Sequence, residues 1–121
     1  MSRLILVVED QQDNRQIIRD LLSALDYELT EAENGVEALA AVAKQKPDLI
    51  LMDIQMPIMD GYEATRRIKA DPATKAIPII AVTSYALSGD EQKARDAGCD
   101  DYVPKPFSPR QLLAKIRQYL P

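Results

Sequence analysis

Histidine and tryptophan are absent from this chain of 121 residues, and cysteine occurs once, as Cys99. Without histidine, the chain has no Ser-His-Asp or Cys-His catalytic set and no zinc site that uses imidazole ligands. It also cannot carry a phosphohistidine of its own. A single cysteine cannot form an internal disulfide, which favours a reducing cytosol, and we expect Cys99 to fill a small buried or half-buried space.

Long hydrophobic runs and basic blocks are also missing. No apolar stretch approaches the roughly 20 residues of a membrane span, and the short apolar run near the N-terminus lacks the cleavage site of a signal peptide. The 15 basic and 19 acidic side chains give a net charge of −4, which disfavours non-specific binding to nucleic acid. The sequence therefore predicts neither a membrane protein nor a nucleic-acid-binding protein, and its length suits one domain, residues 1–121.

The chain does contain a regular alternation of strand and helix patterns. Apolar runs predict strands at residues 4–8, 27–32, 49–52, 79–82 and 101–104. Apolar residues at helical spacing predict helices at residues 14–25, 36–44, 62–70 and 88–98, and a last helix that begins near residue 108. Such an alternation is typical of an α/β fold with a parallel sheet.

Capping signals and spacing predict details of these helices. Asp13 is the expected N-cap of the first helix, and Ser88 opens an expected capping box in the fourth. Gly98 is expected just past the end of the fourth helix, and Pro109 at the first position of the last. The side chains expected to face the core are Ile17, Ile18, Leu21, Leu22 and Leu25, then Val36, Leu39, Ala40 and Ala43, and finally Leu112, Leu113, Ile116 and Leu120.

The composition of each strand predicts its place in the sheet. Residues 4–8, 49–52 and 79–82 are continuously apolar, as expected for central parallel strands that are covered on both faces. Residues 27–32 carry polar positions and residues 101–104 include a proline, so we expect both at the edges. With these two strands outside, the pattern resembles a doubly wound, flavodoxin-like (βα)5 parallel sheet, and we take from that fold the strand order 2-1-3-4-5 with a switch point between the first and third strands.

Reactive polar residues follow four of the predicted strands: Glu9 with Asp10, Asp53, Thr83, and Lys105. The carboxyl ends of parallel strands share one edge of a sheet, where ligands bind, so we expect these side chains to meet. Three crowded carboxylates repel one another unless a cation intervenes, and oxygen ligands that leave room for water suit Mg²⁺. Each acid alone favours the alternative of a solvated loop residue, but three at one edge favour a site for a cation and a phosphoryl group.

Four longer motifs hold these residues. They are Val-Val-Glu-Asp at 7–10, Leu-Met-Asp-Ile-Gln-Met-Pro-Ile-Met-Asp-Gly at 51–61, Ile-Ala-Val-Thr-Ser at 80–84, and Gly-Cys-Asp-Asp-Tyr-Val-Pro-Lys-Pro-Phe at 98–107. With these motifs in this order and spacing, the chain resembles response-regulator receiver domains of two-component signalling, including single-domain regulators of the cell-division type. Receiver modules of hybrid histidine kinases look much the same, so a module cut from such a kinase stays an alternative.

The resemblance implies how the carboxylates divide their roles. Asp53 is the phosphoacceptor, and Asp10 and Asp53 are direct ligands of Mg²⁺. Glu9 assists through water, and the backbone carbonyl of Gln55 completes the protein ligands. Mn²⁺ or Ca²⁺ is expected to substitute for Mg²⁺.

The resemblance also implies how the phosphoryl group is held and sensed. Thr83 and Lys105 contact it, and Tyr102 is the switch aromatic, whose ring is expected to move as Thr83 moves. The bond from Lys105 to Pro106 is expected to be cis, although only about one in twenty such bonds is cis in folded proteins. Gln55 and Tyr85 flank the route of hydrolytic water in this family, and since both are fairly bulky we expect slow self-dephosphorylation.

The implied function is a signalling switch in a two-component system or phosphorelay. A histidine kinase or histidine phosphotransferase supplies the phosphoryl group, and the surface of the fourth helix, fifth strand and fifth helix then binds a downstream protein. We expect a cytoplasmic phosphoprotein, monomeric or weakly dimeric, with a single receiver domain at residues 1–121 and no output domain. It is not expected to be an enzyme, since at most it catalyses its own phosphorylation and dephosphorylation.

Three other functions compete with this one. A metal-dependent phosphohydrolase that forms aspartyl phosphate would need an acid–base Asp where Gln55 stands. A nucleotide- or flavin-binding module is disfavoured because the chain has no G-x-G-x-x-G motif and no P-loop. A receiver that binds partners without phosphorylation is disfavoured by the intact acceptor, acid pair, Thr83 and Lys105, but stays open.

Overall fold

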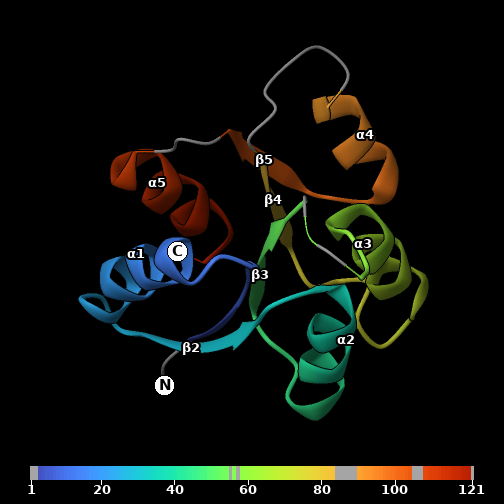
Figure 1. Cartoon of the computed structure of the whole chain (residues 1–121), viewed down its shortest axis with the longest axis horizontal. Coiled ribbons are helices and arrows are strands. Elements are labelled where there is room, and N and C mark those ends of the chain that lie inside the picture. The colour runs from blue at the N-terminus through green and yellow to red at the C-terminus, as the bar shows by residue number, and fades with distance from the viewer. Residues whose placement is uncertain (1–2, 55, 57, 84–89, 105–107, 121) are drawn as a thin grey trace.

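In the computed structural model, residues 3–54, 56, 58–83, 90–104 and 108–120 are described. Within these residues, five strands alternate with five helices along the chain (Figure 1). The strands are β1 (Arg3–Val8), β2 (Tyr27–Ala32), β3 (Leu49–Asp53), β4 (Ile79–Thr83) and β5 (Asp101–Pro104). The helices are α1 (Gln12–Ser23), α2 (Gly35–Lys44), α3 (Gly61–Ala70), α4 (Asp90–Ala97) and α5 (Pro109–Tyr119).

The strands form one parallel sheet in the order β2-β1-β3-β4-β5, which confirms the predicted topology. Helices α1 and α5 cover one face, and α2, α3 and α4 cover the other (Figure 1). Each face has its own hydrophobic core. The first includes Ile5, Leu51, Ile80, Ile18, Leu22, Leu112 and Ile116, and the second includes Leu6, Ile50, Ile79, Ala38, Val42, Ala64, Ile68 and Ala94.

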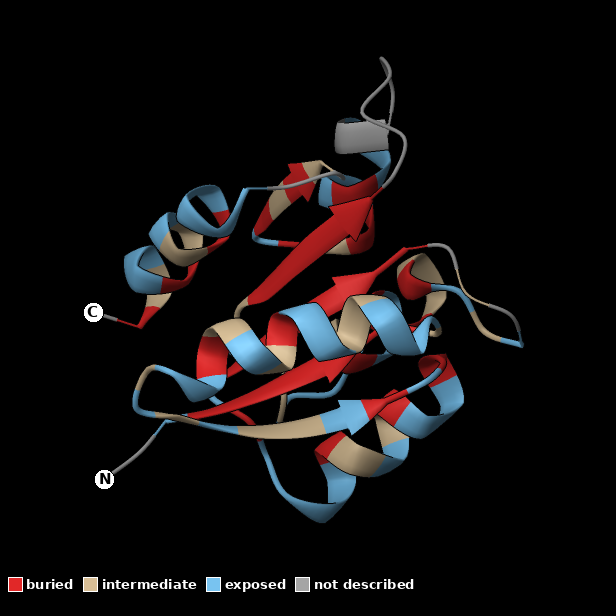
Figure 2. Cartoon of the chain, turned by 60° about the vertical axis from the view of Figure 1, so that its left-hand side comes forward, coloured by how far each residue is buried: buried red, intermediate tan, exposed pale blue. Residues whose placement is uncertain are grey.

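The burial of the strands confirms which of them are central. Every residue of β3 and β4, and all of β1 beyond its first residue, is buried, so these arrows are almost entirely red in Figure 2. By contrast, β2 has only intermediate and exposed residues before its buried last residue, Ala32, and β5 alternates between buried and intermediate positions. The polar β2 and the proline-containing β5 therefore lie at the edges, where unpaired backbone groups reach solvent.

Four predicted core positions on α1 and α2 are wrong: Ile17, Val36, Ala40 and Ala43 are exposed. Ile17 is 54% exposed and Val36 is 49% exposed. The buried stripe of α1 is centred on Ile18 and Leu22, and adjacent residues of a helix are about 100° apart around its axis, so Ile17 turns away from the sheet. In α2 nearly every position is apolar, which leaves the period ambiguous: the buried side is Ala38 and Val42, while Ala40 and Ala43 are exposed.

Helix ends are predicted with mixed success. The N-cap of α1 is Gln11, which forms no side-chain capping bond, so Asp13 lies inside the first turn and the predicted cap there is wrong. The α5 start is confirmed, because Ser108 and Gln111 form a capping box and Pro109 is the first helical residue. Gly98 follows α4 with φ of 112°, the left-handed conformation expected after a helix end. The capping box predicted at Ser88 lies outside the described residues.

Candidate functional site

Three carboxylates meet at the carboxyl edge of the sheet. The strand register pairs Val8 of β1 with Met52 of β3, and the next residues along these strands are Glu9 and Asp53. One carboxylate oxygen from each of Glu9, Asp10 and Asp53 can be chosen so that all three lie within 4.8 Å of one another. Glu9 is 2% exposed and Asp53 4% exposed, while Asp10 is half-buried. The structure thus brings together the three acids that the sequence predicted for one site.

The electrostatics of this cluster favour a cation. Burial raises the pKa of Asp10, and the neighbouring Glu9 raises it further through a side-chain hydrogen bond and through its charge, whereas contact with Asp53 lowers it. A raised pKa means that the ionised form of Asp10 is disfavoured in the metal-free site. Three hard oxygen donors of this kind fit a Mg²⁺ ion, which binds carboxylates and retains water ligands.

Thr83 lies one strand further along the same edge. Val82 of β4 is the register partner of Asp53, and Thr83 is the next residue, at the end of β4. The Thr83 side chain is 2% exposed. Its position beside the acid cluster is the one that the sequence predicted for a hydroxyl that contacts a phosphoryl group.

Tyr102 lies on β5, next to β4. Its register partner is Ala81, two residues before Thr83. The ring is half-buried and packs against the core under α3 and α4. This position is compatible with the predicted switch role, which stays a prediction.

Four predicted site residues lie outside the described part of the chain: Gln55, Tyr85, Lys105 and Pro106. The roles predicted for these residues therefore stay predictions: the carbonyl ligand and the water route, the ammonium that binds the phosphoryl group, and the cis peptide bond. The described residues contain the predicted acceptor Asp53, the acids Glu9 and Asp10, the hydroxyl of Thr83 and the predicted switch residue Tyr102.

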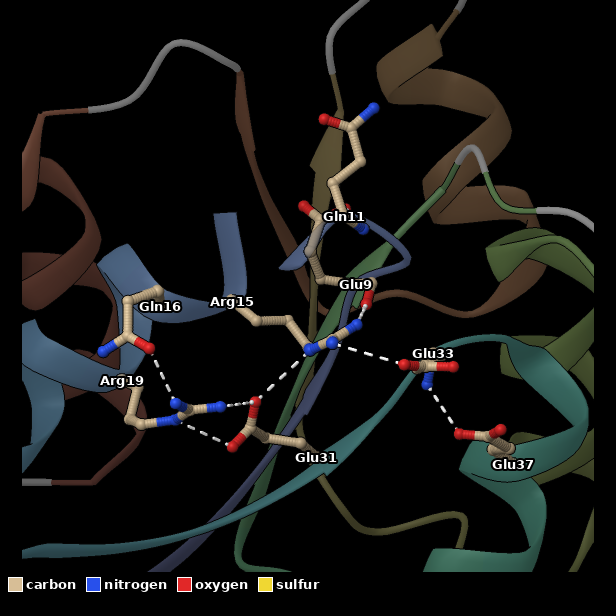
Figure 3. Close-up of polar contacts among 8 residues, drawn as sticks. All are labelled: Glu9, Gln11, Arg15, Gln16, Arg19, Glu31, Glu33 and Glu37. Carbon is tan, nitrogen blue, oxygen red and sulfur yellow. Dashed lines mark hydrogen bonds and ion pairs between the residues drawn. The ribbon is translucent and has the colours of Figure 1, made fainter. Parts of the chain in front are cut away.

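The structure adds a residue that sequence reasoning missed. The Nη1 of Arg15 donates a hydrogen bond to the backbone carbonyl of Glu9, with an N–O distance of 2.8 Å. The acids that hold this guanidinium, Glu31 and Glu33, come from the end of β2 (Figure 3). Because they are 16 and 18 residues from Arg15 in the sequence, no local pattern signals the contact.

A second missed feature is the close approach of α3 to Asp53. Gly61, the first residue of α3, donates its N–H to the carbonyl of Ile54 at 3.0 Å. A β-carbon at position 61 would stand 2.3 Å from the carbonyl oxygen of Asp53. Only glycine lets the helix start this close to the end of β3.

Ile58 in the loop between β3 and α3 is strained. Its φ is 71°, in the left-handed region, and its side chain is 81% exposed. This conformation costs a β-branched residue about 1–2 kcal/mol, and the exposed side chain recovers little by packing. The strain lies five residues from Asp53, in the loop that connects β3 to α3.

Replacing Ile58 with Asn is expected to stabilise the protein. Asn tolerates the left-handed region, so Ile58→Asn should raise the free energy of unfolding by about 1 kcal/mol, measured by urea denaturation. Val36→Asn is the matched control, since Val36 is also an exposed apolar residue but lies in α2 with ordinary helical geometry. Equal effects of the two substitutions would contradict the assignment of strain to Ile58.

Cys99 is confirmed as a core filler. It is 6% exposed, and its Sγ lies 3.7 Å from Oγ1 of Thr65. Burial raises the pKa of the thiol to about 11, so the reactive thiolate is scarce at neutral pH.

Among the described residues, no helix is long and apolar enough to cross a bilayer.

Comparison with known proteins agrees with this geometry. The family model described as the response regulator receiver domain matches residues 5–117. The polar-differentiation response regulator DivK of Brucella anthropi is 42% identical over 120 residues, which cover 99% of this chain and 98% of that protein.

Solved structures agree as well. The receiver domain of the sensor histidine kinase PA1611 from Pseudomonas aeruginosa PAO1, with a magnesium ion coordinated in its active site cleft, superposes with a TM-score of 0.92 at 38% identity, covering 99% of this chain and 98% of that one. The chemotaxis protein CheY4 of Vibrio cholerae gives a TM-score of 0.92 at 29% identity, covering 98% and 99% of the two chains.

Proposed function

Since the chain belongs to the response regulator receiver domain family, we propose that Asp53 accepts a phosphoryl group from the phosphohistidine of a partner protein. The observation that carries this proposal is the cluster of Glu9, Asp10 and Asp53, whose ligand atoms lie within 4.8 Å of one another beside Thr83. Because this chain has no histidine of its own, the phosphohistidine must belong to a partner. The proposed donor is a histidine kinase or a histidine phosphotransferase.

In the proposed chemical step this chain contributes Asp53 and Thr83, at the carboxyl edge of the sheet, together with Lys105. A carboxylate oxygen of Asp53 attacks the phosphorus, a new O–P bond forms as the P–N bond of the donor breaks, and the imidazole leaves. The hydroxyl of Thr83 and the ammonium of Lys105 hold the phosphoryl oxygens. Because Asp53 is nearly buried, the acceptor is already oriented before the partner docks.

Asp10 and Asp53 would hold Mg²⁺ directly, with Glu9 acting through water and the carbonyl of Gln55 as a further ligand. The fit rests on the all-oxygen donor set and on the raised pKa of Asp10, which a cation would bring down again. When bound, the ion neutralises negative charge that builds up on the phosphoryl oxygens. Mn²⁺ and Ca²⁺ offer similar coordination and are proposed as substitutes.

The output of the switch is proposed to pass through α4, β5 and α5. Movement of Thr83 toward the phosphoryl group would open space for the ring of Tyr102, two strand positions away on the neighbouring strand. A cavity of about 180 Å³ lies on this face, lined by Tyr102, Val103, Pro104, Gln111, Ala114 and Lys115. A downstream regulatory protein, or weakly a second copy of the chain, would bind here.

Residues 1–121 are proposed to act as one cytoplasmic receiver domain that changes only its own phosphorylation state. The free, buried thiol of Cys99 suits a reducing compartment. Two alternatives stay open: that the chain is a receiver module of a hybrid histidine kinase, and that it binds partners without phosphorylation. Both alternatives are compatible with the fold and with the cluster of Glu9, Asp10 and Asp53.

Self-dephosphorylation is expected to be slow because of Tyr85. Tyr85→Ala removes the bulky ring that is proposed to flank the route of hydrolytic water, so the phosphorylated protein should lose its phosphoryl group several-fold faster. The decay is followed by intact mass after the phosphodonor is removed. An unchanged or slower decay would show that Tyr85 does not limit access of water.

The proposed function is tested with a small phosphodonor. The protein is incubated with acetyl phosphate, with Mg²⁺ or with a chelator, and its intact mass is measured. One phosphoryl group gained only with Mg²⁺ supports the proposal. Continuous release of phosphate from varied phosphomonoesters would support a phosphohydrolase instead, and partner binding without any gain in mass would support a phosphorylation-independent module.

A further inference from the structure

The side chain of Arg15 is largely buried and contacts the backbone of Glu9, a residue of the acid cluster. Only 11% of its side chain is exposed, although it lies on the surface helix α1. Its Nη1 donates to the carbonyl oxygen of Glu9 at 2.8 Å. The other nitrogens face two acids at the end of β2, with Nε 3.4 Å from Oε1 of Glu31 and Nη2 3.3 Å from Oε1 of Glu33 (Figure 3).

These contacts fix the backbone that carries the acid cluster. The N–H of Glu9 donates to the carbonyl of Ala32 at 3.0 Å, so the Glu9 residue is tied to the end of β2 on one side and to Arg15 on the other. The carbonyl that Arg15 binds belongs to the peptide between Glu9 and Asp10. The direction of that peptide plane decides where the Asp10 side chain leaves the backbone.

The charge of Arg15 is neutralised within its own network. Arg19 donates to both carboxylate oxygens of Glu31, with Nε–Oε2 3.0 Å and Nη2–Oε1 2.7 Å. Two guanidinium groups therefore face two carboxylates, and the set carries no net charge. Arg15 can thus orient the acid loop without adding net positive charge beside a cation site.

We infer that Arg15 is a positioning residue for the divalent cation: through the carbonyl of Glu9 it holds Asp10 in the direction that coordinates the ion. This inference rests on the proposed function, because it assumes that the acid cluster binds Mg²⁺. The contacts through which Arg15 acts are with the carbonyl of Glu9 and with Glu31 and Glu33, so the expected effect is on metal affinity and not on the nucleophile.

The sign of the effect separates positioning from simple electrostatics. Removal of a positive charge near a cation site should tighten Mg²⁺ binding by Coulomb's law. Loss of the hydrogen bond that orients a ligand should weaken it, by roughly tenfold. Arg15→Gln removes both the charge and the fork of donors that reaches the Glu9 carbonyl, so the direction of the change decides between the two.

The experiment is a Mg²⁺ titration of ¹⁵N-labelled protein, read from amide shifts around Asp10 and Asp53. Arg15→Gln is expected to raise the dissociation constant roughly tenfold and Arg15→Lys roughly threefold, because lysine keeps one donor but not the fork. Arg19→Gln is the matched control: it removes an equal charge and a partner of Glu31 but does not touch Glu9. It should bind Mg²⁺ within twofold of the wild type.

Other outcomes overturn the inference. The inference is wrong if Arg15→Gln binds Mg²⁺ as tightly as the wild type or more tightly. It is also wrong if Arg15→Gln and Arg19→Gln lose the same Mg²⁺ affinity. If Arg15→Gln does not fold, Arg15→Lys decides alone, and wild-type affinity in that variant contradicts positioning. A wild-type protein that binds no Mg²⁺ would instead contradict the proposed function, so the two failures are distinct.

Discussion

Asp53→Asn is expected to gain no phosphoryl group from acetyl phosphate under conditions in which the wild type gains one. The amide has nearly the same shape as the carboxylate and fits the same buried position, where Asp53 is 4% exposed. However, its nitrogen and oxygen lone pairs are too weakly nucleophilic to attack phosphorus. Because the substitution also removes one charge from three crowded acids, we expect the free energy of unfolding to stay within about 1 kcal/mol of the wild type.

Asp13→Asn is the matched control for this loss. Asp13 is an exposed acid in the first turn of α1, close in sequence to Glu9 and Asp10 but outside the cluster. This variant should be phosphorylated as fully as the wild type. A folded Asp53→Asn protein that still gains a Mg²⁺-dependent phosphoryl group would place the acceptor elsewhere.

Gly61→Ala is expected to destabilise the protein by about 3 kcal/mol, the upper end of the range for an overpacked site. The added β-carbon would stand 2.3 Å from the carbonyl oxygen of Asp53 and 2.9 Å from Cα of Ile54. Both are backbone atoms that cannot rotate away, so α3 or the end of β3 has to shift. We therefore expect slower phosphorylation as well, since the acceptor is on the strand end that is displaced.

Asp60→Ala separates this clash from a weakened helix start. Asp60 is the N-cap of α3, and its carboxylate accepts the N–H of Glu63 at 2.9 Å. Its loss should cost about 1 kcal/mol and leave Asp53 in place. Urea denaturation followed by circular dichroism compares the two variants. A Gly61→Ala protein as stable as Asp60→Ala would show that the helix moves away freely.

The sheet was predictable from the sequence because its strands differ in kind. Continuous apolar runs can be buried on both faces, whereas the polar β2 and the Pro104-containing β5 cannot, and this contrast places β2 and β5 at the edges. The order of the three central strands is that of the flavodoxin-like fold, which the alternation of strands and helices resembles. With the order known, the shared carboxyl edge brings Glu9, Asp10 and Asp53 together. The fold and the acid cluster therefore follow from composition and topology.

Features that depend on three-dimensional contact were not predictable. The alanine-rich α2 could bury several faces equally well, and packing against the sheet selected Ala38 and Val42. Arg15 pairs with Glu31 in β2 and with Glu33 just after it, and the distance of these acids from α1 is decided only in the folded chain. The positive φ of Ile58 was not predictable either, because isoleucine is a residue type that normally avoids this backbone conformation.

The most direct test of the account is chemical mapping of the phosphorylated residue. The protein phosphorylated with acetyl phosphate and Mg²⁺ is reduced with borohydride, which converts an aspartyl phosphate into homoserine, and its peptides are analysed by mass spectrometry. We predict homoserine at position 53 and nowhere else. Conversion of Asp10, or a phosphoryl group that resists borohydride on a hydroxyl side chain, would contradict the assignment of Asp53 as the acceptor.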